Sequence, residues 1–295
     1  MPPDLHVTRE IPPLPVRGDE AHKGTVGRVV VLGGQSGETT MIGAVAITVN
    51  AAYRAGAGLV RAIVPAEIVN AVATLASGAT FAALTDDSES LLRQLADYKA
   101  TVLAAGPGLG QSVSRQTLLE VIDGFDGPIV LDADALTLLG DGEPPAIRQS
   151  GRVVLTPHHG EMLRLLAREN DSFTGTDHET RRRAIEAVHA AYGAVTVLKG
   201  HRTMVTNGER LYVNETGNSG MATGGCGDVL TGVIAALIGQ GMETFEASIL
   251  GVYLHGLAGD FAAEEMGRFS LVAHDLLTYI PESFREYESS ATDLP

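Results

Sequence analysis

Six short apolar runs, rich in Val, Leu and Ile and bounded by Gly or Pro, constrain the fold of this chain more than any other feature. They occupy residues 27–34, 59–65, 101–106, 128–134, 152–157 and 194–200. Runs of this length without polar alternation are typical of strands buried on both faces of a parallel sheet. Segments with helical spacing lie between them, at residues 41–55, 88–98, 114–125 and 176–192. The alternation predicts a doubly wound α/β fold, with a mostly parallel sheet and helices on both of its faces.

The last third of the chain departs from this alternation. Residues 203–205 and 210–213, joined by Asn207-Gly208, predict a β-hairpin. Three helical segments and no further strand are expected after it, at residues 228–238, 245–265 and 271–287. The middle one is apolar on more than one face, which suits either a buried helix or a contact between subunits.

Composition limits the domain organisation. With 295 residues and 44% hydrophobic content, the chain can bury the core of one large domain or of two small ones. Because no charge run or low-complexity linker divides it, we expect one domain over residues 23–287. Residues 1–22, with five prolines among the first 19, predict an extended arm that packs on the domain or on a neighbour. Residues 288–295 are expected to form a frayed tail.

The charge and the single cysteine limit the partners and the location. A net charge of −15, spread along the chain, argues against nucleic acid or an anionic membrane, because both require a basic face. One cysteine allows no internal disulfide and favours a reducing compartment. No apolar run is long enough to span a bilayer, and the N-terminus does not resemble a signal peptide. We therefore expect a soluble cytoplasmic protein.

The stretch TGNSGMATGGCGD, which ends at Asp228, predicts an anion cradle. Gly224, Gly225 and Gly227 allow positive φ and close approach to a ligand, and the amides of a first helical turn attract phosphate. Gly225, Cys226 and Gly227 would form the cradle. Since a carboxylate gains little by binding a polyanion, Asp228 is better explained as a base for a hydroxyl that attacks the phosphate. The alternative is a glycine-rich turn in which Asp228 only caps the helix.

Unusual polar motifs follow the predicted strands. They read GGQS, GPGLG, DAD, TPHHGE and KGHRT, and begin at residues 33, 106, 132, 156 and 199. Each alone is explained by a tight turn, a helix entry, a cap or a loop histidine. Ligands of open α/β sheets bind beyond the carboxyl ends of the strands, so these motifs together would surround one cleft.

The order of the motifs resembles that of the ADP-dependent NAD(P)H-hydrate dehydratases. The resemblance covers residues 23–281 and rests on KGxxG at residue 23, GAGLV at 56, GPGLG at 106, LDADA at 131, TPHxGE at 156, KGxxT at 199 and the glycine cluster 217–232. It implies a ribokinase-like fold. It also implies dehydration of the S-epimer of hydrated NADH or NADPH, by phosphorylation of the ring hydroxyl and elimination of phosphate. The family uses ADP in bacteria and archaea and ATP in eukaryotes, with Mg²⁺, and is often tetrameric. Since the chain is too short to contain the epimerase domain of many bacterial members, the resemblance implies a separate epimerase.

The resemblance also assigns site residues. The nucleotide positions of the family match Lys199, Gly200, His201, Arg202, Thr203 and Gly227. The positions that contact the hydrated dinucleotide match Ala44, Gly108, His158 and Asp228. Asp228 would take the proton of the ring hydroxyl as that oxygen attacks the terminal phosphate of ADP. Lys199 would supply a mobile point charge, while backbone amides of the cradle stabilise the transferred phosphoryl group. No protein ligand is assigned to the metal, because phosphate and water are expected to bind it.

Three residues depart from the family pattern: Cys226 replaces Thr or Ser, while Ser219 and His159 replace Pro. Cys226, at a helix N-terminus, is either a reactive thiol with a lowered pKa or a residue that contributes only its amide. His159 either adds a cation to the site or is a solvated loop histidine.

Two other functions are compatible with the sequence. A small-molecule kinase of the same superfamily, acting on a hydroxymethylpyrimidine, a hydroxyethylthiazole or a sugar, would use the same base and cradle. The motifs GPGLG and TPHxGE favour the dehydratase. A catalytically silent nucleotide-binding protein is the third hypothesis, and the presence of both Asp228 and Lys199 weighs against it. The sequence does not distinguish ADP from ATP, or NADH hydrate from NADPH hydrate.

Overall fold

A computed structural model describes residues 5–145, 151–166 and 171–292 of the chain. In this part of the chain ten strands form one sheet in the order β1-β10-β9-β8-β7-β6-β5-β2-β3-β4. The strands are β1 (His6–Thr8), β2 (Arg28–Leu32), β3 (Leu59–Val64), β4 (Thr80–Ala83), β5 (Val102–Ala105), β6 (Ile129–Leu131), β7 (Val153–Leu155), β8 (Val195–Leu198), β9 (Met204–Thr206) and β10 (Arg210–Val213). All neighbouring pairs are parallel except β8 with β9 and β9 with β10. The predicted mostly parallel sheet and the predicted hairpin are both confirmed.

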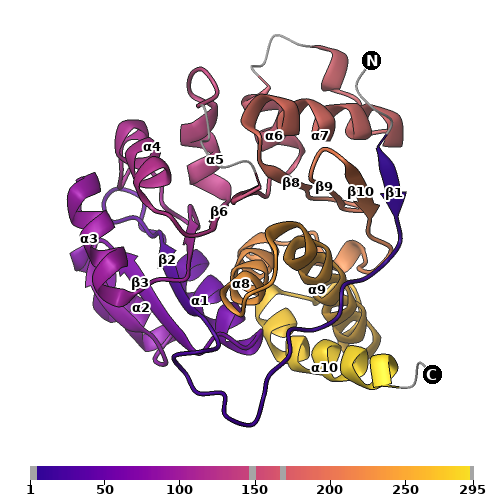
Figure 1. Cartoon of the computed structure of the whole chain (residues 1–295), viewed down its shortest axis with the longest axis horizontal. Helices are drawn as coiled ribbons and strands as arrows, with labels where there is room; N and C mark the ends of the chain where they lie inside the picture. The colour runs from indigo at the N-terminus through magenta and orange to yellow at the C-terminus, as the bar shows by residue number, and fades with distance from the viewer. Residues whose placement is uncertain (1–4, 146–150, 167–170, 293–295) are drawn as a thin grey trace.

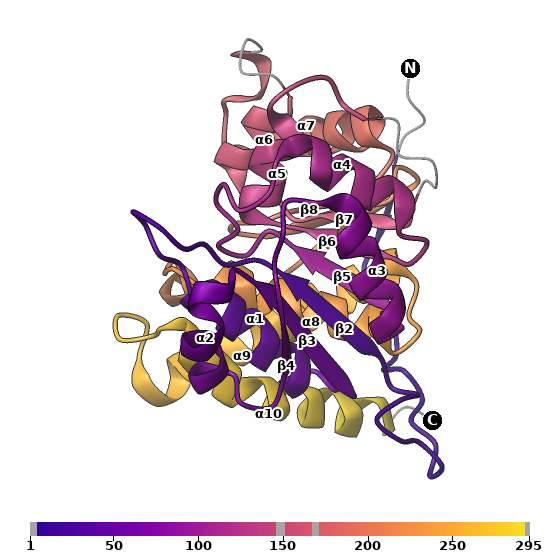
Figure 2. The same ribbon diagram turned by 90° about the vertical axis from the view of Figure 1, so that its left-hand side faces the viewer.

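Helices cover both faces of the sheet (Figure 1 and Figure 2). One hydrophobic cluster joins the sheet to α1 (Gly43–Arg54), α2 (Val69–Leu75), α8 (Cys226–Gly239), α9 (Thr244–Met266) and α10 (Ala273–Thr292). A second cluster joins the other face to α3 (Ser88–Tyr98), α4 (Arg115–Gly124), α5 (Ala133–Gly140), α6 (His159–Leu165) and α7 (His178–Tyr192). Strand β2 contributes to both clusters, because Val29 and Val31 face the first while Val30 and Leu32 face the second. This explains why its sequence shows no polar alternation.

Several short elements were not predicted from the sequence. Strand β4 lies at the edge of the sheet beyond β3, is only four residues long and has exposed residues at both of its ends, Thr80 and Ala83. Helices α5 and α6 begin immediately after β6 and β7, where the sequence predicts only strand ends and loops. Ala133 has a φ of 49°, which turns the chain sharply from β6 into α5. Short 3₁₀ turns are present as η1 (Ala66–Ile68), η2 (Asp171–Phe173) and η3 (Ser219–Met221).

The N-terminal arm packs along the domain. Strand β1 pairs in parallel with β10, and the chain then runs past α9 and α10 toward β2 (Figure 1). The Tyr287 hydroxyl lies 3.0 Å from the carbonyl oxygen of Ile11 and 3.1 Å from that of Pro12. The Arg17 guanidinium donates to Gln240 Oε1 at 2.9 Å. These contacts tie the arm to two helices.

The C-terminal helix is longer than expected. Helix α10 continues through residue 288 to Thr292, so most of the segment expected to be a frayed tail is helical. Residues 1–4 of the predicted arm and residues 293–295 of the predicted tail lie outside the described residues. Among the described helices, none combines the length and the apolar character that crossing a membrane requires.

Helix α8 is the element that brings the two sides of the site together. It packs closely against α1, since a Cβ atom at Gly232 would lie 2.3 Å from the carbonyl oxygen of Thr48 and 2.7 Å from Cβ of Ala51. Only glycine permits this approach of the two backbones. The N-terminus of α8 lies beside the segments that follow β6 and β8, since a Cβ atom at Gly227 would lie 3.8 Å from Oδ2 of Asp132 and 3.3 Å from Nζ of Lys199.

Candidate active site

A cavity of about 720 Å³ lies beside the N-terminus of α8. Its walls come from the loop after β8, the glycine-rich loop, the first turn of α8 and part of α9. The residues that the sequence predicts to bind nucleotide all line this cavity: Lys199, Gly200, His201, Arg202, Thr203 and Gly227. His158 and Cys226 line it as well. The structure therefore gathers residues of separate motifs in one cavity.

The glycine cluster differs in detail from its prediction. Gly225, the N-cap residue of α8, has a φ of 94°, but Gly224 and Gly227 do not adopt positive φ, so the prediction is wrong for these two. Gly227 lies inside the helix, and a Cβ atom there would lie 3.3 Å from Nζ of Lys199. The amides of the first turn of α8 have no acceptor within the helix, as at any helix N-terminus. They and the adjacent ammonium group can attract phosphate.

Asp228 lies in the first turn of α8 and is partly buried. It does not cap the helix, because Gly225 is the N-cap residue and, in the described structure, no side chain accepts a capping hydrogen bond there. Burial first, and then the charge of Asp132, raise the pKa of Asp228 to about 7. Lys199 acts in the opposite direction. A carboxyl group with a pKa near neutrality suits the role of a general base.

Lys199 is fixed in a network of buried polar side chains. Its amine lies 2.5 Å from Oδ1 of Asp132 and 3.7 Å from Oε2 of Glu161. Asp132 is only 1% exposed and also accepts hydrogen bonds of 2.8 Å from the hydroxyls of Thr156 and Thr231. Burial alone would lower the pKa of Lys199, but the neighbouring carboxylates raise it overall, so the amine stays protonated. The amine that was expected to act as a mobile point charge is thus paired with Asp132 in this structure.

His158 is the N-cap residue of α6 and forms a capping box with Glu161. Its Nδ1 accepts hydrogen bonds from the amides of Gly160 at 3.0 Å and Glu161 at 3.3 Å, and Oε2 of Glu161 accepts from the His158 amide at 2.7 Å. Burial and the nearby Lys199 lower the pKa of His158. The imidazole is therefore neutral near pH 7, and its Nε2 lies 3.4 Å from Oε1 of Glu161.

Ala44 and Gly108 form a second group and are not among the residues that line the cavity. A Cβ atom at Gly108, whose φ is 59°, would lie 3.3 Å from Cβ of Ala44. The same loop is held by Asp134, whose Oδ2 accepts the Gly110 amide at 2.8 Å. The charge of Asp134, the residue that holds this loop, also raises the pKa of Asp228.

The three departures from the family pattern have different surroundings. Burial raises the pKa of the Cys226 thiol to about 11, so the hypothesis of a reactive thiol is wrong. Its carbonyl oxygen accepts a hydrogen bond of 2.9 Å from Nε2 of His255, a residue that burial keeps neutral by lowering its pKa to about 4. His159 begins α6 and is half-buried, so it is not a solvated loop residue. Ser219 begins η3 and lines the cavity.

Four side chains of this site were not predicted as functional residues. Asp132, Thr156 and Glu161 belong to motifs that the sequence already shows. Only the fold reveals that Asp132 and Glu161 contact Lys199 and that Thr156 donates to Asp132. Thr231 carries no sequence signal, because it lies in an apolar helix where a threonine commonly has no more than a packing role.

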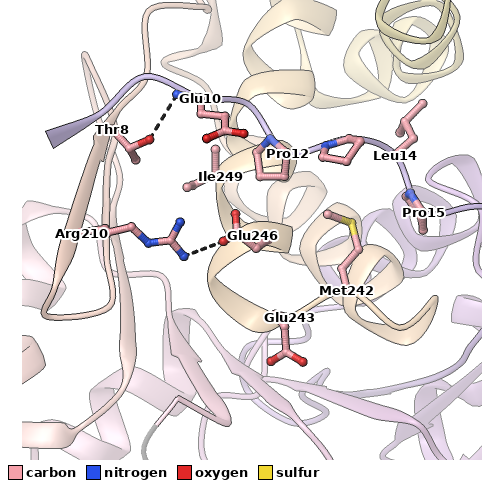
Figure 3. A pocket seen from close by; sticks show the side chains of 11 residues that line it. Thr8, Glu10, Pro12, Leu14, Pro15, Arg210, Met242, Glu243, Glu246 and Ile249 are labelled. Atoms are coloured by element: carbon pink, nitrogen blue, oxygen red, sulfur yellow. Dashed lines mark hydrogen bonds and ion pairs between the residues drawn. The ribbon is translucent and has the colours of Figure 1, made fainter. Parts of the chain in front are cut away.

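A second cavity lies under the N-terminal arm (Figure 3). It measures about 390 Å³ and contains the ion pair of Arg210 with Glu246, whose atoms are 2.6 Å apart. Glu243 and Met242 also line it, and none of the predicted site residues does. The cavity beside α8 is therefore the candidate active site.

The fold defines a protein of the ribokinase-like class, with a mostly parallel sheet and with ribokinase-like and dehydratase structures among its structural neighbours. The particular family follows from the sequence. The chain belongs to the NAD(P)H-hydrate dehydratase family, whose model matches residues 29–282. This match confirms the resemblance deduced from the motifs.

Individual relatives agree with that assignment. The ADP-dependent (S)-NAD(P)H-hydrate dehydratase of Neisseria meningitidis is 37% identical over 254 residues, covering 85% of this chain and 82% of that protein. The bifunctional NAD(P)H-hydrate repair enzyme of Moorella thermoacetica is 42% identical over 287 residues, covering 93% of this chain and 52% of that protein. This chain thus spans about half the length of the bifunctional relative.

A solved structure gives the same result for the fold. The ADP/ATP-dependent NAD(P)H-hydrate dehydratase of Bacillus subtilis, co-crystallized with ATP/Mg²⁺, superposes with a TM-score of 0.77 at 29% identity. The superposition covers 93% of this chain and 94% of that chain. The whole domain is therefore shared.

Proposed function

We propose that this protein dehydrates the S-epimer of hydrated NADH or NADPH, with ADP as phosphoryl donor. The observation that carries the proposal is Asp228, a carboxyl group with a pKa of about 7 in the first turn of a helix whose free amides adjoin the cavity. Family membership and the Neisseria relative support the substrate and the donor.

The proposed reaction begins with transfer of a phosphoryl group to the hydrate. Asp228 takes the proton of the ring hydroxyl while that oxygen attacks the terminal phosphorus of ADP, and the bond from this phosphorus to AMP breaks. Amides of the first turn of α8 stabilise the charge on the transferred group. The phosphate ester then eliminates inorganic phosphate: its C–O bond breaks, the neighbouring ring carbon loses a proton to solvent, and the double bond formed between the two carbons restores the reduced nicotinamide. Phosphorylation is needed because hydroxide is a much poorer leaving group than phosphate.

The residues of the cavity are proposed to divide between the two substrates. Lys199, Gly200, His201, Arg202, Thr203 and Gly227 would hold the nucleotide, since they line one cavity at the N-terminus of α8. Ala44, Gly108 and His158 would contact the hydrated dinucleotide on either side of Asp228. The anchored amine of Lys199 would attract phosphate from a fixed position, at the edge of that cavity.

Mg²⁺ is proposed to enter with the nucleotide. In the described parts of the chain, no group of three or more His, Cys, Asp or Glu side chains is arranged to hold a metal ion. Phosphate oxygens and water would therefore supply most of its ligands, as is common for this ion. The Bacillus protein was co-crystallized with ATP/Mg²⁺, which supports this proposal.

The cellular setting is also proposed. Because the hydrate can exist as two epimers and the reaction uses one of them, an epimerase acting in the same pathway would supply the S-epimer. A cytoplasmic homotetramer is proposed on the resemblance to the family. Size-exclusion chromatography with light scattering would measure the assembly directly.

The test is recovery of reduced-nicotinamide absorbance when purified protein is mixed with hydrated NADH and Mg²⁺. ADP and ATP are supplied in parallel reactions, and hydrated NADPH is used in a second series. Recovery with ADP confirms the reaction and the donor together, whereas recovery only with ATP keeps the reaction and refutes the donor. If folded protein that binds nucleotide recovers no absorbance with either donor, a kinase acting on small alcohols becomes the better hypothesis.

A further inference from the structure

Asp132 is the residue on which the polar network of the site converges. Its carboxylate accepts hydrogen bonds at both oxygens: Lys199 at 2.5 Å and Thr156 at 2.8 Å on Oδ1, and Thr231 at 2.8 Å on Oδ2. These donors belong to three different elements, since Thr156 follows β7, Lys199 follows β8, and Thr231 lies in α8. Only 1% of the surface of Asp132 is exposed, so water competes little for these hydrogen bonds.

Helix capping does not explain this residue. Asp132 occupies the N-cap position of α5, yet its side chain makes no capping hydrogen bond among the described residues. Both oxygens are instead directed to side chains of the site. Thr231 likewise donates across to Asp132, whereas hydroxyl groups within helices commonly donate to the carbonyl four residues earlier.

We propose that Asp132 is a positioning residue, which holds the Lys199 amine in its own ion pair and so leaves Asp228 free to act as the base. The proposal rests on the proposed function of Asp228. The geometry supports it, because Lys199 is within 4 Å of Asp132 and Glu161, while no such ion pair joins it to Asp228 in the described structure. Thr231, three residues after Asp228, ties Asp132 to the helix that carries the base.

The charges around Asp228 make this arrangement testable. The groups that act on it are Asp132 at the end of β6, Asp134 in α5, Glu161 in α6 and Lys199 after β8. Lys199 is the cation of this set and lowers the pKa of Asp228, whereas the three carboxylates raise it. The Cys226 thiol of α8 itself is uncharged near pH 7, because burial raises its pKa.

Substitutions of the two partners should therefore act in opposite directions. Asp132→Asn removes a negative charge and releases the amine toward Asp228, and both changes lower the pKa of Asp228. Lys199→Met removes the positive charge and raises that pKa. The acidic limb of the kcat/KM profile should move to lower pH in the first variant and to higher pH in the second, each by about one pH unit. If Asp132 had only a structural role, its substitution would reduce the rate, but the two variants would not shift the acidic limb in opposite directions.

A second measurement does not depend on turnover. ¹³C NMR of protein labelled at the aspartate carboxyl carbons follows the titration of Asp228 directly, with the resonance assigned by its loss in Asp228→Asn. The exposed Asp97 of α3 offers a matched control, since Asp97→Asn should leave the titration of Asp228 in place. Opposite shifts of the Asp228 titration support the proposal even if the protein lacks dehydratase activity, in which case only the proposed function fails.

The outcomes that would overturn the proposal are definite. If Asp228 titrates unchanged in both variants, or moves in the same direction in both, then Asp132 does not control the interaction between Lys199 and Asp228. If Asp132→Asn does not fold, as judged by far-UV circular dichroism, the titration of Asp228 in Lys199→Met is the deciding measurement. An Asp228 titration that does not move to higher pH in that variant refutes the proposal.

Discussion

Asp228→Asn tests the environment of the proposed base through protein stability, independently of the reaction. Burial and the charge of Asp132 raise the pKa of Asp228 from 3.8 to about 7, so between these values the folded protein binds a proton that the unfolded chain has released. For a group whose pKa is raised by folding, the stabilising contribution is fully present below the unfolded pKa and is lost as pH rises through the folded pKa. The wild type should therefore lose stability between pH 4 and pH 7.

The magnitude follows from the two pKa values. Linkage gives a loss of about 4 kcal/mol in the free energy of unfolding over the whole interval, of which roughly 2 to 3 kcal/mol falls between pH 5 and pH 8. Since Asp228 is not fully buried, solvent screening reduces the expected difference to about 2 kcal/mol. Asn does not titrate, so the variant should gain this amount relative to the wild type when the pH is raised from 5 to 8.

Urea unfolding followed by far-UV circular dichroism measures the difference, and the absence of tryptophan makes fluorescence less suitable. The wild type, Asp228→Asn and Asp97→Asn are compared at pH 5 and pH 8 without nucleotide. The Asp97 variant should show no pH-dependent difference from the wild type, because its side chain is exposed in α3. An Asp228→Asn difference that is equal at both pH values would refute the raised pKa. The same variant should bind nucleotide but lose turnover by at least about a hundredfold.

Three further predictions concern packing, the thiol and the arm. Gly232→Ala places a methyl group 2.3 Å from the carbonyl oxygen of Thr48 and should cost about 1 to 3 kcal/mol; an unchanged melting temperature would contradict the close packing of α1 and α8. Cys226, whose thiol pKa is raised to about 11, should react with iodoacetamide at pH 8 about a hundredfold more slowly when folded than in urea. Equal rates would show that the thiol is not protected. Tyr287→Phe removes a donor to the arm and should cost about 1 kcal/mol, with faster proteolysis near Ile11; an unaltered cleavage rate would mean that other contacts hold the arm.

The sequence predicted the fold best where burial of a strand produces a continuous apolar run in the sequence. The apolar runs predict β2, β3 and β5 to β8 because strands covered on both faces tolerate few polar residues. Strand β4 and the strand of the arm are not marked in this way, since edge strands are covered on fewer sides and their pairing depends on distant segments. Helices α5 and α6 are short, and a period of 3.6 residues is barely expressed over two turns.

The candidate site was predictable in its motifs but not in its contacts. The partners of Asp132 are 24, 99 and 67 residues away in the sequence, at Thr156, Thr231 and Lys199. No local pattern encodes such a convergence, which arises only when parallel strands place their carboxyl ends at one edge of the sheet. The conformation of a glycine cluster is equally hidden, because glycine permits positive φ at Gly224 and Gly225 alike, and the structure uses it only at Gly225.

A base beside a phosphate site must satisfy two opposed requirements. The amides of α8 and the amine of Lys199 that attract phosphate also stabilise the charged form of Asp228, and alone they would make it a weak base. Burial and Asp132 act against this and bring the pKa to about 7. Because Asp132 binds Lys199 at 2.5 Å, one carboxylate keeps the cation at the edge of the cavity and also raises the proton affinity of the base. The cost is the pH-dependent loss of stability calculated for Asp228, which Asp228→Asn should remove together with turnover.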